Sequence, residues 1–173
     1  YSNLGSIQTS GIDVQLNWAF PLLAGRMSVN SVVNFLDYYR DQVSPKDAFI
    51  DSTGTFRTGG QYDYRILTTL NYSQGAWSAG VRHRFLPGIK DASYATNKAT
   101  TVLPVGAYGT LDAFGSYEIN KQIQLRGGID NVTDRNPPRV GINPGQTAAA
   151  GITNPQYYDV LGRRYYMSVT LTL

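Results

Sequence analysis

The sequence predicts an all-β chain, a transmembrane antiparallel β-barrel of which it supplies about seven strands. Apolar and polar residues alternate with a period of two in several stretches of the 173 residues, which is the pattern of strands with two different faces. The connections between these stretches alternate between short turns and long polar segments. Charged residues make up only 16% of the chain, below the roughly 25% of ordinary globular domains.

The predicted strands are each about ten residues long, the length that crosses a bilayer at a tilt near 45°. They cover residues 11–20, 26–39, 61–73, 76–85, 110–119, 122–130 and 165–173. The first stretch alternates strictly and the second less well, because Val32 and Leu36 fall on its polar parity. In the last stretch every second residue from Tyr165 to Leu173 is apolar.

The connections favour a barrel in a membrane. Short turns are predicted at Pro21–Gly25, Gln74-Gly75 and Asn120-Lys121. Long polar segments cover roughly 40–60, 86–106 and 131–156. Short turns on one side and long loops on the other are typical of outer-membrane barrels.

The charged and aromatic residues fit the same interpretation. On the apolar parity, His83 is the only ionisable side chain well inside a strand. Aromatic residues of that parity gather at two heights. Those next to the short turns are Trp18, Phe20, Tyr72, Trp77 and Tyr117. Those towards the long loops are Tyr39, Tyr62, Tyr64 and Phe85. Bilayer interfaces select two such girdles, whereas the alternative, a soluble β-sandwich or lectin-like domain, has no reason to hold rings at fixed heights.

Composition argues against several other classes of protein. The net charge is +3 without a run of Lys or Arg, so nucleic acid is not an expected partner. The chain has no Cys and a single His, so we expect no disulfide, metal site or cofactor. Because His83 lies on the apolar parity, away from polar partners, we expect no enzymatic activity.

Counting strand directions predicts a segment of a larger barrel. If the long loops lie outside the cell, the last strand runs inward, and so does the first. Seven strands that begin outside do not make the even number of a bacterial single-chain barrel. We therefore expect residues 1–173 to be the C-terminal part of a barrel mostly encoded upstream.

The two ends of the chain resemble one protein family. The tail, in which Tyr158-Asp159, Gly162-Arg163 and Tyr166 lead into an alternating strand, is similar to the C-terminus of TonB-dependent outer-membrane receptors. The opening Gly11-Ile12-Asp13 resembles the Gly-Val/Ile-Glu/Asp strand that recurs in the same family. The tail departs from the usual pattern only in ending with Leu173 rather than Phe.

An internal motif adds to the resemblance. The segment 128–134, Gly-Ile-Asp-Asn-Val-Thr-Asp, follows the strand that contains Asp112 and Tyr117 and the hairpin after it. It is similar to the Asn-Leu-Phe-Asp-type motif that follows the penultimate hairpin of these receptors. Here Val132-Thr133 stands where Leu-Phe is more usual.

The resemblance implies a barrel of 22 strands with a plugged lumen, and active uptake across the outer membrane of a Gram-negative bacterium. Such receptors take up ferric siderophores, corrinoids, haem or oligosaccharides, energised through TonB. The plug would be N-terminal and absent from this chain. Implied partners are the lipid bilayer, the plug and remaining barrel, the TonB complex, the barrel-assembly machinery and a small-molecule or oligosaccharide substrate. A smaller barrel that acts as a passive pore or a membrane enzyme remains the alternative.

Three groups of residues are candidates for function. Loop residues with an aromatic ring or a hydrogen-bonding group could contact a ligand: Tyr38, Arg57, Tyr94, Arg139, Gln146 and Tyr157. Charges on the polar parity would face the lumen and contact plug or substrate, or only pair across strands: Asp63, Arg65, Arg82, Arg84, Asp112, Arg126, Asp130 and Arg164. Asp112 and Arg126 are the expected structural pair. The assembly signal would be the apolar side of the last strand: Tyr165, Met167, Val169, Leu171 and Leu173.

Overall fold

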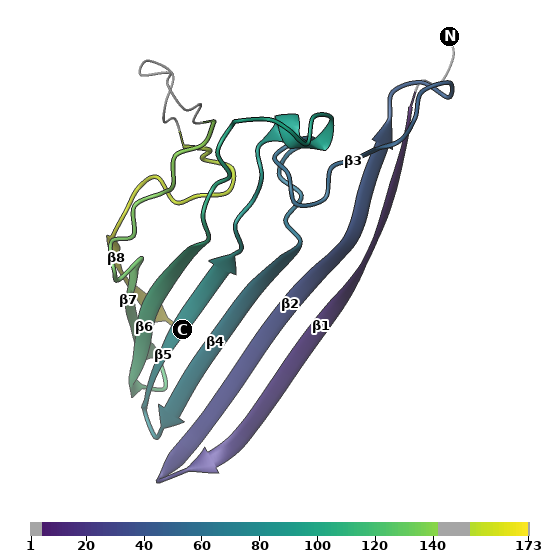
Figure 1. Ribbon diagram of the computed structural model, residues 1–173. Helices are drawn as coiled ribbons and strands as arrows, with labels where there is room; N and C mark the ends of the chain where they lie inside the picture. Colours follow the sequence, from purple (N-terminus) through teal and green to yellow (C-terminus); the bar gives the residue numbers. More distant parts are fainter. Residues whose placement is uncertain (1–4, 142–152, 173) are drawn as a thin grey trace.

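The chain folds into one open antiparallel sheet (Figure 1). The computed structural model describes residues 5–141 and 153–172. Neighbouring strands follow the order β1-β2-β4-β5-β6-β7-β8, and the short β3 pairs with β2. The strands are β1 (Ser6–Leu22), β2 (Gly25–Gln42), β3 (Ile50–Asp51), β4 (Tyr64–Gln74), β5 (Trp77–Leu86), β6 (Tyr108–Asn120), β7 (Ile123–Asp130) and β8 (Arg164–Leu171).

The all-β antiparallel architecture confirms the predicted fold class. Seven long strands lie where alternation predicts them, and β3 is an additional short strand inside a long connection. The described residues contain one short helix, the 3-10 helix η1 (Ala92–Ala95). None of their helices has the length and apolar character needed to span a membrane.

Strands β1 and β2 extend well beyond their predicted bounds, and a bulge accounts for the irregular alternation in β2. Strand β6 exceeds its predicted bounds by less, with 13 residues. β1 has 17 residues and β2 has 18. Gly11 pairs with Leu36 whereas Ser10 pairs with Tyr38, which leaves Asp37 without a partner in the ladder. The extra residue reverses the alternation beyond it. Tyr39 consequently pairs with Thr9, and its predicted place in the outer aromatic girdle is wrong.

The short turns close as tightly as the sequence predicts. The β4–β5 hairpin turns over Gly75-Ala76, because Gln74 and Trp77 are the last paired residues. Gly75 has a φ of 56°, a left-handed conformation that glycine adopts without a steric penalty. In the β6–β7 turn the side chain of Asn120 accepts hydrogen bonds from the backbone N–H groups of Gln122 and Ile123, at 2.8 and 2.9 Å.

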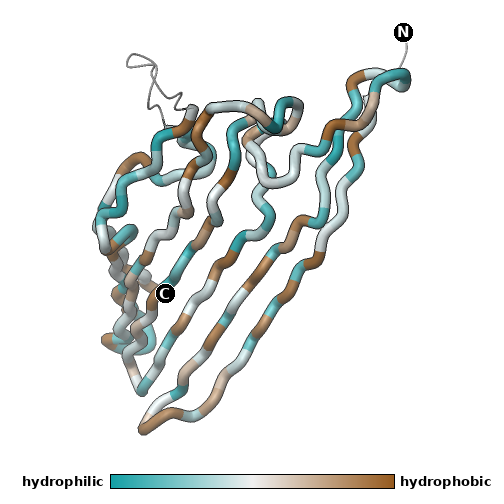
Figure 2. The backbone as a smooth tube through the Cα atoms, viewed as in Figure 1, coloured by the Kyte–Doolittle hydropathy of each residue, from teal (hydrophilic) through white to brown (hydrophobic). Residues whose placement is uncertain are grey.

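The register gives the sheet one apolar and one polar face. Directly paired residues share a face, and one row of pairs across β2, β4, β5 and β6 is Val29, Leu70, Val81 and Ala113. The polar face carries Arg65, Arg82, Arg84, Asp112, Arg126, Asp130 and Arg164. Hydrophobic and hydrophilic residues therefore alternate along each strand (Figure 2).

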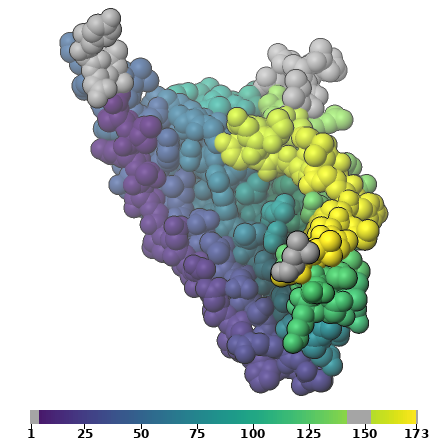
Figure 3. Space-filling model, turned by 180° about the vertical axis from the view of Figure 1, so that it is seen from behind, coloured from purple at the N-terminus to yellow at the C-terminus, as the bar shows by residue number. Residues whose placement is uncertain are grey.

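The sheet is not closed. β1 and β8 lie at its two ends, and the described residues of these strands pair with each other nowhere. Seen from behind, the sheet bounds a hollow between β1 on one side and β8 with its preceding segment on the other (Figure 3). Apolar side chains of the outer strands stay exposed, with Ile12 at 67% and Met167 at 81%, so this face requires apolar surroundings.

The hydrophobic core of the chain lies among the long connections and not on the sheet. We name these connections loop A (43–63), loop B (87–107) and loop C (131–163). Their core comprises Tyr62, Ile89, Val105 and Tyr158 together with Tyr108, the first residue of β6, each at most 5% exposed. Loops A and B also share backbone hydrogen bonds, because the N–H of Lys90 donates to Gly54 and the N–H of Phe56 donates to Lys90. The prediction that Tyr62 belongs to an aromatic girdle is therefore wrong.

Candidate ligand site on the polar face

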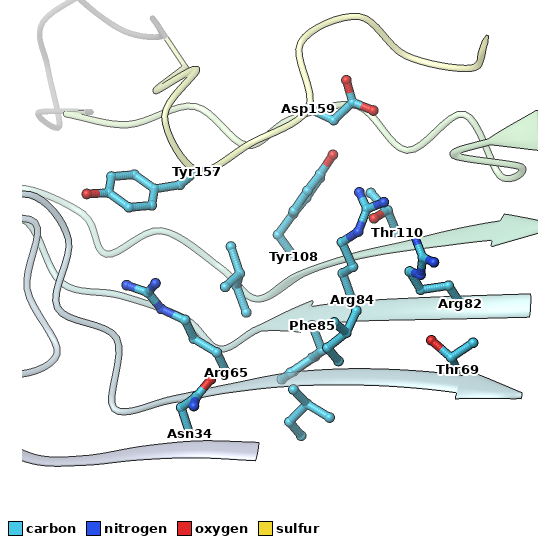
Figure 4. A pocket seen from close by; sticks show the side chains of 13 residues that line it. Asn34, Arg65, Thr69, Arg82, Arg84, Phe85, Tyr108, Thr110, Tyr157 and Asp159 are labelled. Atoms are coloured by element: carbon cyan, nitrogen blue, oxygen red, sulfur yellow. The ribbon is translucent and has the colours of Figure 1, made fainter. Parts of the chain in front are cut away.

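A cavity of about 500 Å³ lies on the polar face beneath loop C. Strands β2, β4, β5 and β6 form its wall, and loop C contributes Tyr157 and Asp159 (Figure 4). Its lining combines three guanidinium groups with aromatic and aliphatic side chains. The residues that matter for its chemistry are Arg65, Arg82, Arg84, Tyr108, Tyr157 and Asp159. A site of this size and mixed lining is typical of a small-molecule pocket.

Arg65 is held in place from the loop side. Its Nη2 donates to the carbonyl oxygen of Gly60 at 3.1 Å, and its guanidinium lies 5.3 Å from the ring centre of Tyr62. Both contacts leave other N–H groups of the guanidinium free to bind a further acceptor. No carboxylate within the described residues forms an ion pair with Arg65.

Arg82 and Arg84 compete for a single carboxylate. In the ladder Arg82 lies directly opposite Asp112. The carboxylate nevertheless binds Arg84, with 2.6 Å between Nη2 and Oδ2, and its other oxygen accepts the backbone N–H of Asn131 at 3.0 Å. Arg82 instead places its guanidinium 5.7 Å from the ring centre of Phe114. Arg82 therefore has no ion-pair partner among the described residues.

The acidic residue of the cavity is also occupied. Asp159 accepts Nη1 of Arg164 at 3.0 Å, and Arg164 reaches Asp130 at 3.4 Å with its other nitrogen. Asp159 further accepts the backbone N–H of Leu161 at 3.0 Å. The carboxylate is thus bound within loop C and β8, which leaves the arginines of the wall in excess.

Aromatic side chains pack where loops A and C meet above the cavity. The hydroxyl groups of Tyr62 and Tyr158 lie 2.9 Å apart, and Tyr158 packs edge-on against Tyr108. Burial raises the pKa of Tyr62, and its hydrogen bond with Tyr158 raises that pKa further. Burial likewise raises the pKa of Tyr158, so both phenols stay protonated at physiological pH.

Tyr157 extends this packing to the rim of the cavity. Its ring lies 5.8 Å from that of Tyr62 and presses on Gly60, where an added Cβ would come within 2.9 Å of the Tyr157 ring carbon Cζ. Gly60 has a φ of 76°, a backbone conformation that favours glycine. The same glycine therefore positions both Tyr157 and Arg65.

The predicted loop residues lie in separate places. Of those that the structure describes, only Tyr157 lines the cavity. Arg57 is bound to Asp41, at 2.8 Å through Nη2, and to Ser52. The side chain of Tyr94 lies beside two ammonium groups, 4.1 Å from that of Lys90 and 4.3 Å from that of Lys98. Two further predicted residues do not line the cavity: Tyr38 stacks with Arg40, and Arg139 is exposed. Gln146 lies outside the described residues.

Two predictions concern charged residues of the polar face, the pair Asp112 and Arg126 and the position of Asp63. The predicted pair of Asp112 and Arg126 is wrong, because Arg126 donates to Gln124 at 3.1 Å while Asp112 binds Arg84. The β6–β7 turn does place these strands side by side, but Arg126 pairs with Ser116. Asp63 lies just before β4, where its carbonyl oxygen accepts the N–H of Leu36 at 2.9 Å.

The strand β8 is at one end of the sheet and carries residues of the predicted assembly signal, which stays a prediction. Tyr165, Met167, Val169 and Leu171 occupy its apolar parity and are 55–81% exposed. Its inner edge pairs with β7 from Ile123 to Asp130. The last residue of the predicted assembly signal, Leu173, lies outside the described residues.

The family model described as TonB dependent receptor-like, beta-barrel, matches residues 1–132. The chain belongs to the TonB-dependent receptor family. This family consists of outer-membrane transporters and not of enzymes. Searches of curated proteins and of solved structures found no match.

Two of the motifs that resemble this family, segment 128–134 and Gly162-Arg163, are connected by hydrogen bonding across loop C. Asn131 is fully buried with a φ of 52°, and its side-chain amide binds both the N–H and the carbonyl of Arg135. Asp134 accepts the N–H of Arg163 at 3.0 Å, which ties the start of loop C to its end. The motifs could be found from sequence, but their connection across loop C could not.

Tyr108 and Asn34 line the cavity, although neither is among the predicted site residues. Asn34 lies directly opposite Arg65 and donates to Asp13 at 2.7 Å. Its position on the polar parity of β2 could have indicated that it faces the cavity. Every polar-face residue of the sheet has such a position, so parity alone does not single out Asn34.

Proposed function

We propose that this chain forms the C-terminal part of the barrel wall of an outer-membrane transporter that takes up a scarce substrate, energised through TonB. The polar face would line the lumen and the apolar face would contact lipid. The observation that carries the proposal is the cavity on the polar face, walled by four strands and roofed by loop C. A ligand that arrives from outside would meet loops A, B and C before it reaches the wall.

The open sheet supports a larger barrel. Unpaired backbone N–H and carbonyl groups are very costly in hydrocarbon, so a membrane sheet must close. The outer edges of β1 and β8 are unpaired within the described residues. We infer that further strands of the same protein pair with both edges, and that a plug domain encoded upstream fills the lumen.

The substrate would belong to the compounds that cannot diffuse through pores in sufficient amounts. Candidates are a ferric siderophore, a corrinoid, haem or an oligosaccharide. The barrel-assembly machinery would recognise the apolar parity of β8 during insertion. No catalytic role is proposed, because His83 lies on the apolar face opposite Thr68 and Leu111, away from the arginines of the cavity.

The proposal is tested by uptake with the full-length receptor in living cells. Depletion of compounds from a complex medium is compared among cells with the receptor, cells without it, and cells that have the receptor but lack TonB. We expect at least one compound to be depleted only when receptor and TonB are both present. Depletion that needs the receptor but not TonB would identify a passive pore. Conversion of a compound by isolated outer membranes would identify an enzyme.

A further inference from the structure

The cavity on the polar face has an excess of positive charge that the described residues do not neutralise. Arg65, Arg82 and Arg84 line it together with one carboxylate, Asp159. That carboxylate is bound by Arg164. Asp112 lies beside the cavity and is shared between Arg84 and the backbone of Asn131.

The three guanidinium groups follow one another in the register, with Arg84 in the middle. Arg65 is two residues along β4 from the partner of Arg84 and four from Thr69, the partner of Arg82. Arg82 and Arg84 are two residues apart on β5, so both side chains project from the same face. Arg84 lies opposite Leu67, two residues along β4 from Arg65, which is the diagonal relation that long side chains can span. Like charges so placed repel one another, and a concave wall of low dielectric strengthens their field. An anion between them would relieve this repulsion.

The arrangement is also pre-organised for binding. The contacts of Arg65 with Gly60 and with the Tyr62 ring fix its guanidinium before any ligand arrives. Arg84 is fixed by Asp112. Side chains that are already ordered lose less conformational entropy on binding. The guanidinium fork suits the two oxygens of a carboxylate or a phosphate.

The rest of the lining adds a preference for a flat apolar group. Tyr157 and Tyr108 come from the loop side, and Leu67 and Leu86 come from the wall. Val32 pairs with Leu67, which places a second aliphatic side chain on the polar face at this level. A ring bound here would contact apolar surface on two sides.

We propose that this cavity binds an anionic ligand in which a carboxylate or phosphate is attached to a planar, apolar group. Arg65 and Arg84 bind the anionic group, Arg82 adds to the local positive potential, and Tyr157 packs on the planar group. The proposal depends on the proposed function, because it names the substrate class of the same transporter. Neutral oligosaccharides are thereby disfavoured as substrates.

The test measures binding and not transport. The full-length receptor is purified in an uncharged detergent, and ¹⁹F NMR titrations use two probes, 4-fluorobenzoate and the neutral 4-fluorobenzyl alcohol. We expect saturable binding of benzoate with an affinity about tenfold or more above that of the alcohol, as charge-assisted hydrogen bonds predict. The preference should shrink as salt is raised, because ions screen the partly exposed arginines.

Matched variants locate the effect. The double variant Arg65→Gln/Arg84→Gln should abolish the preference for benzoate, while Arg82, directly opposite Asp112, stays available to pair with that carboxylate. Arg126→Gln removes the same kind of charge from the polar face outside this cavity, so it should keep the preference. Tyr157→Ala should weaken both probes by a similar factor, since it removes a packing surface and no charge.

The outcomes separate the hypotheses. Equal binding of both probes by the wild type, or a preference that survives in Arg65→Gln/Arg84→Gln, would overturn the proposal. If the full-length receptor binds no benzoate and a plug-deleted receptor does, acidic plug residues occupy the arginines and the proposal is likewise overturned. A receptor that binds benzoate as expected but shows no TonB-dependent uptake would refute the proposed function and leave the anion site standing.

Discussion

The sheet and the loops of this receptor wall are stabilised in different ways. On the sheet, apolar side chains such as Leu16 and Val169 remain 52% and 55% exposed. In the loops, Ile89 and Tyr158 are 1% and 3% exposed. The sheet therefore relies on surroundings that the chain does not supply, whereas loops A, B and C build a hydrophobic core of their own.

The three loops are ordered by packing against one another. Long outer loops are usually considered mobile and polar. Here each of the three contributes a buried side chain to one shared core, and loops A and B exchange backbone hydrogen bonds. The loops should consequently move as a unit, and the cavity beneath them should keep its shape while a ligand approaches.

The largest expected effect comes from removing the centre of the loop core. Tyr158→Ala should destabilise the loop assembly by about 3–5 kcal/mol, as large-to-small changes of buried aromatics do. Amide hydrogen exchange of the full-length receptor should show faster exchange across loops A, B and C and unchanged exchange in β4 to β7. Tyr165→Ala is the matched control, because Tyr165 is 70% exposed on the sheet and should leave loop exchange unaltered. Exchange confined to loop C would show that the loops are independent.

A charge on the apolar face tests the sheet. Leu70 lies near the middle of β4, on the apolar parity between Tyr64 and Tyr72, so Leu70→Arg places a guanidinium inside the apolar band. The expected cost is about 2–4 kcal/mol, measured as a lower urea midpoint for unfolding from lipid vesicles. Asn71→Arg puts the same side chain on the polar face and should cost much less. Equal costs would contradict the assignment of the two faces.

Alkaline pH should open the loops before the sheet. Burial raises the pKa of Tyr62 and of Tyr158 above the value of about 10 that tyrosine has in an unfolded chain. Their contribution to stability is complete below that value. Above it the unfolded loops lose protons that the folded loops retain, so stability falls with rising pH. Hydrogen exchange between pH 9 and 11.5 should show this loss in the loops.

The variant Tyr62→Phe/Tyr158→Phe is the control for the pH effect. It keeps both rings and removes both ionisable groups, at the expense of the 2.9 Å hydrogen bond between the hydroxyls. Its loops should be slightly less stable at pH 8 and should lose the alkaline sensitivity. The same steep loss in this variant would show that other groups cause it.

Sequence predicts the two regions unequally. The strands and their faces follow from a period of two that each stretch carries by itself. The pairs from β4 to β8 keep that parity except at the register shift between Glu118 and Asn120 beside the β6–β7 turn. The bulge at Asp37 depends on the partner strand, so the alternation of β2 alone placed Tyr39 on the wrong face. Tyr62 fits the alternation of β4 equally well, yet it is buried against Tyr158, 96 residues away.

The candidate site was likewise predictable only in part from the sequence. The wall residues Arg65, Arg82 and Arg84 could be placed on one face from parity alone. Which of them pairs with Asp112 could not, because direct opposition favours Arg82 and the side chain of Arg84 reaches the carboxylate. Tyr157 was a candidate only as one of several loop residues. Its place at the cavity depends on its contact with Gly60 in a different loop.

The smallest expected effect concerns the joint between the two regions. Asp112 binds Arg84 within the sheet and the N–H of Asn131 where loop C begins. A double-mutant cycle with Asp112→Asn and Arg84→Gln should give a coupling of about 0.5–1 kcal/mol in urea unfolding, because the Arg84 side chain is 48% exposed and solvent weakens the pair. The cycle with Asp112→Asn and Arg126→Gln should be additive within about 0.5 kcal/mol.

Hydrogen exchange of the Asp112→Asn variant shows whether the ion pair with Arg84 also stabilises loop C. The side-chain amide oxygen introduced by Asp112→Asn can still accept the N–H of Asn131, so the start of loop C keeps its hydrogen bond while the ion pair is lost. If loop exchange stays at the wild-type rate in that variant, the ion pair belongs to the sheet alone. If exchange in loop C rises, the carboxylate is what couples the wall to the loops, and a ligand that competes for Arg84 would then loosen the loops above it.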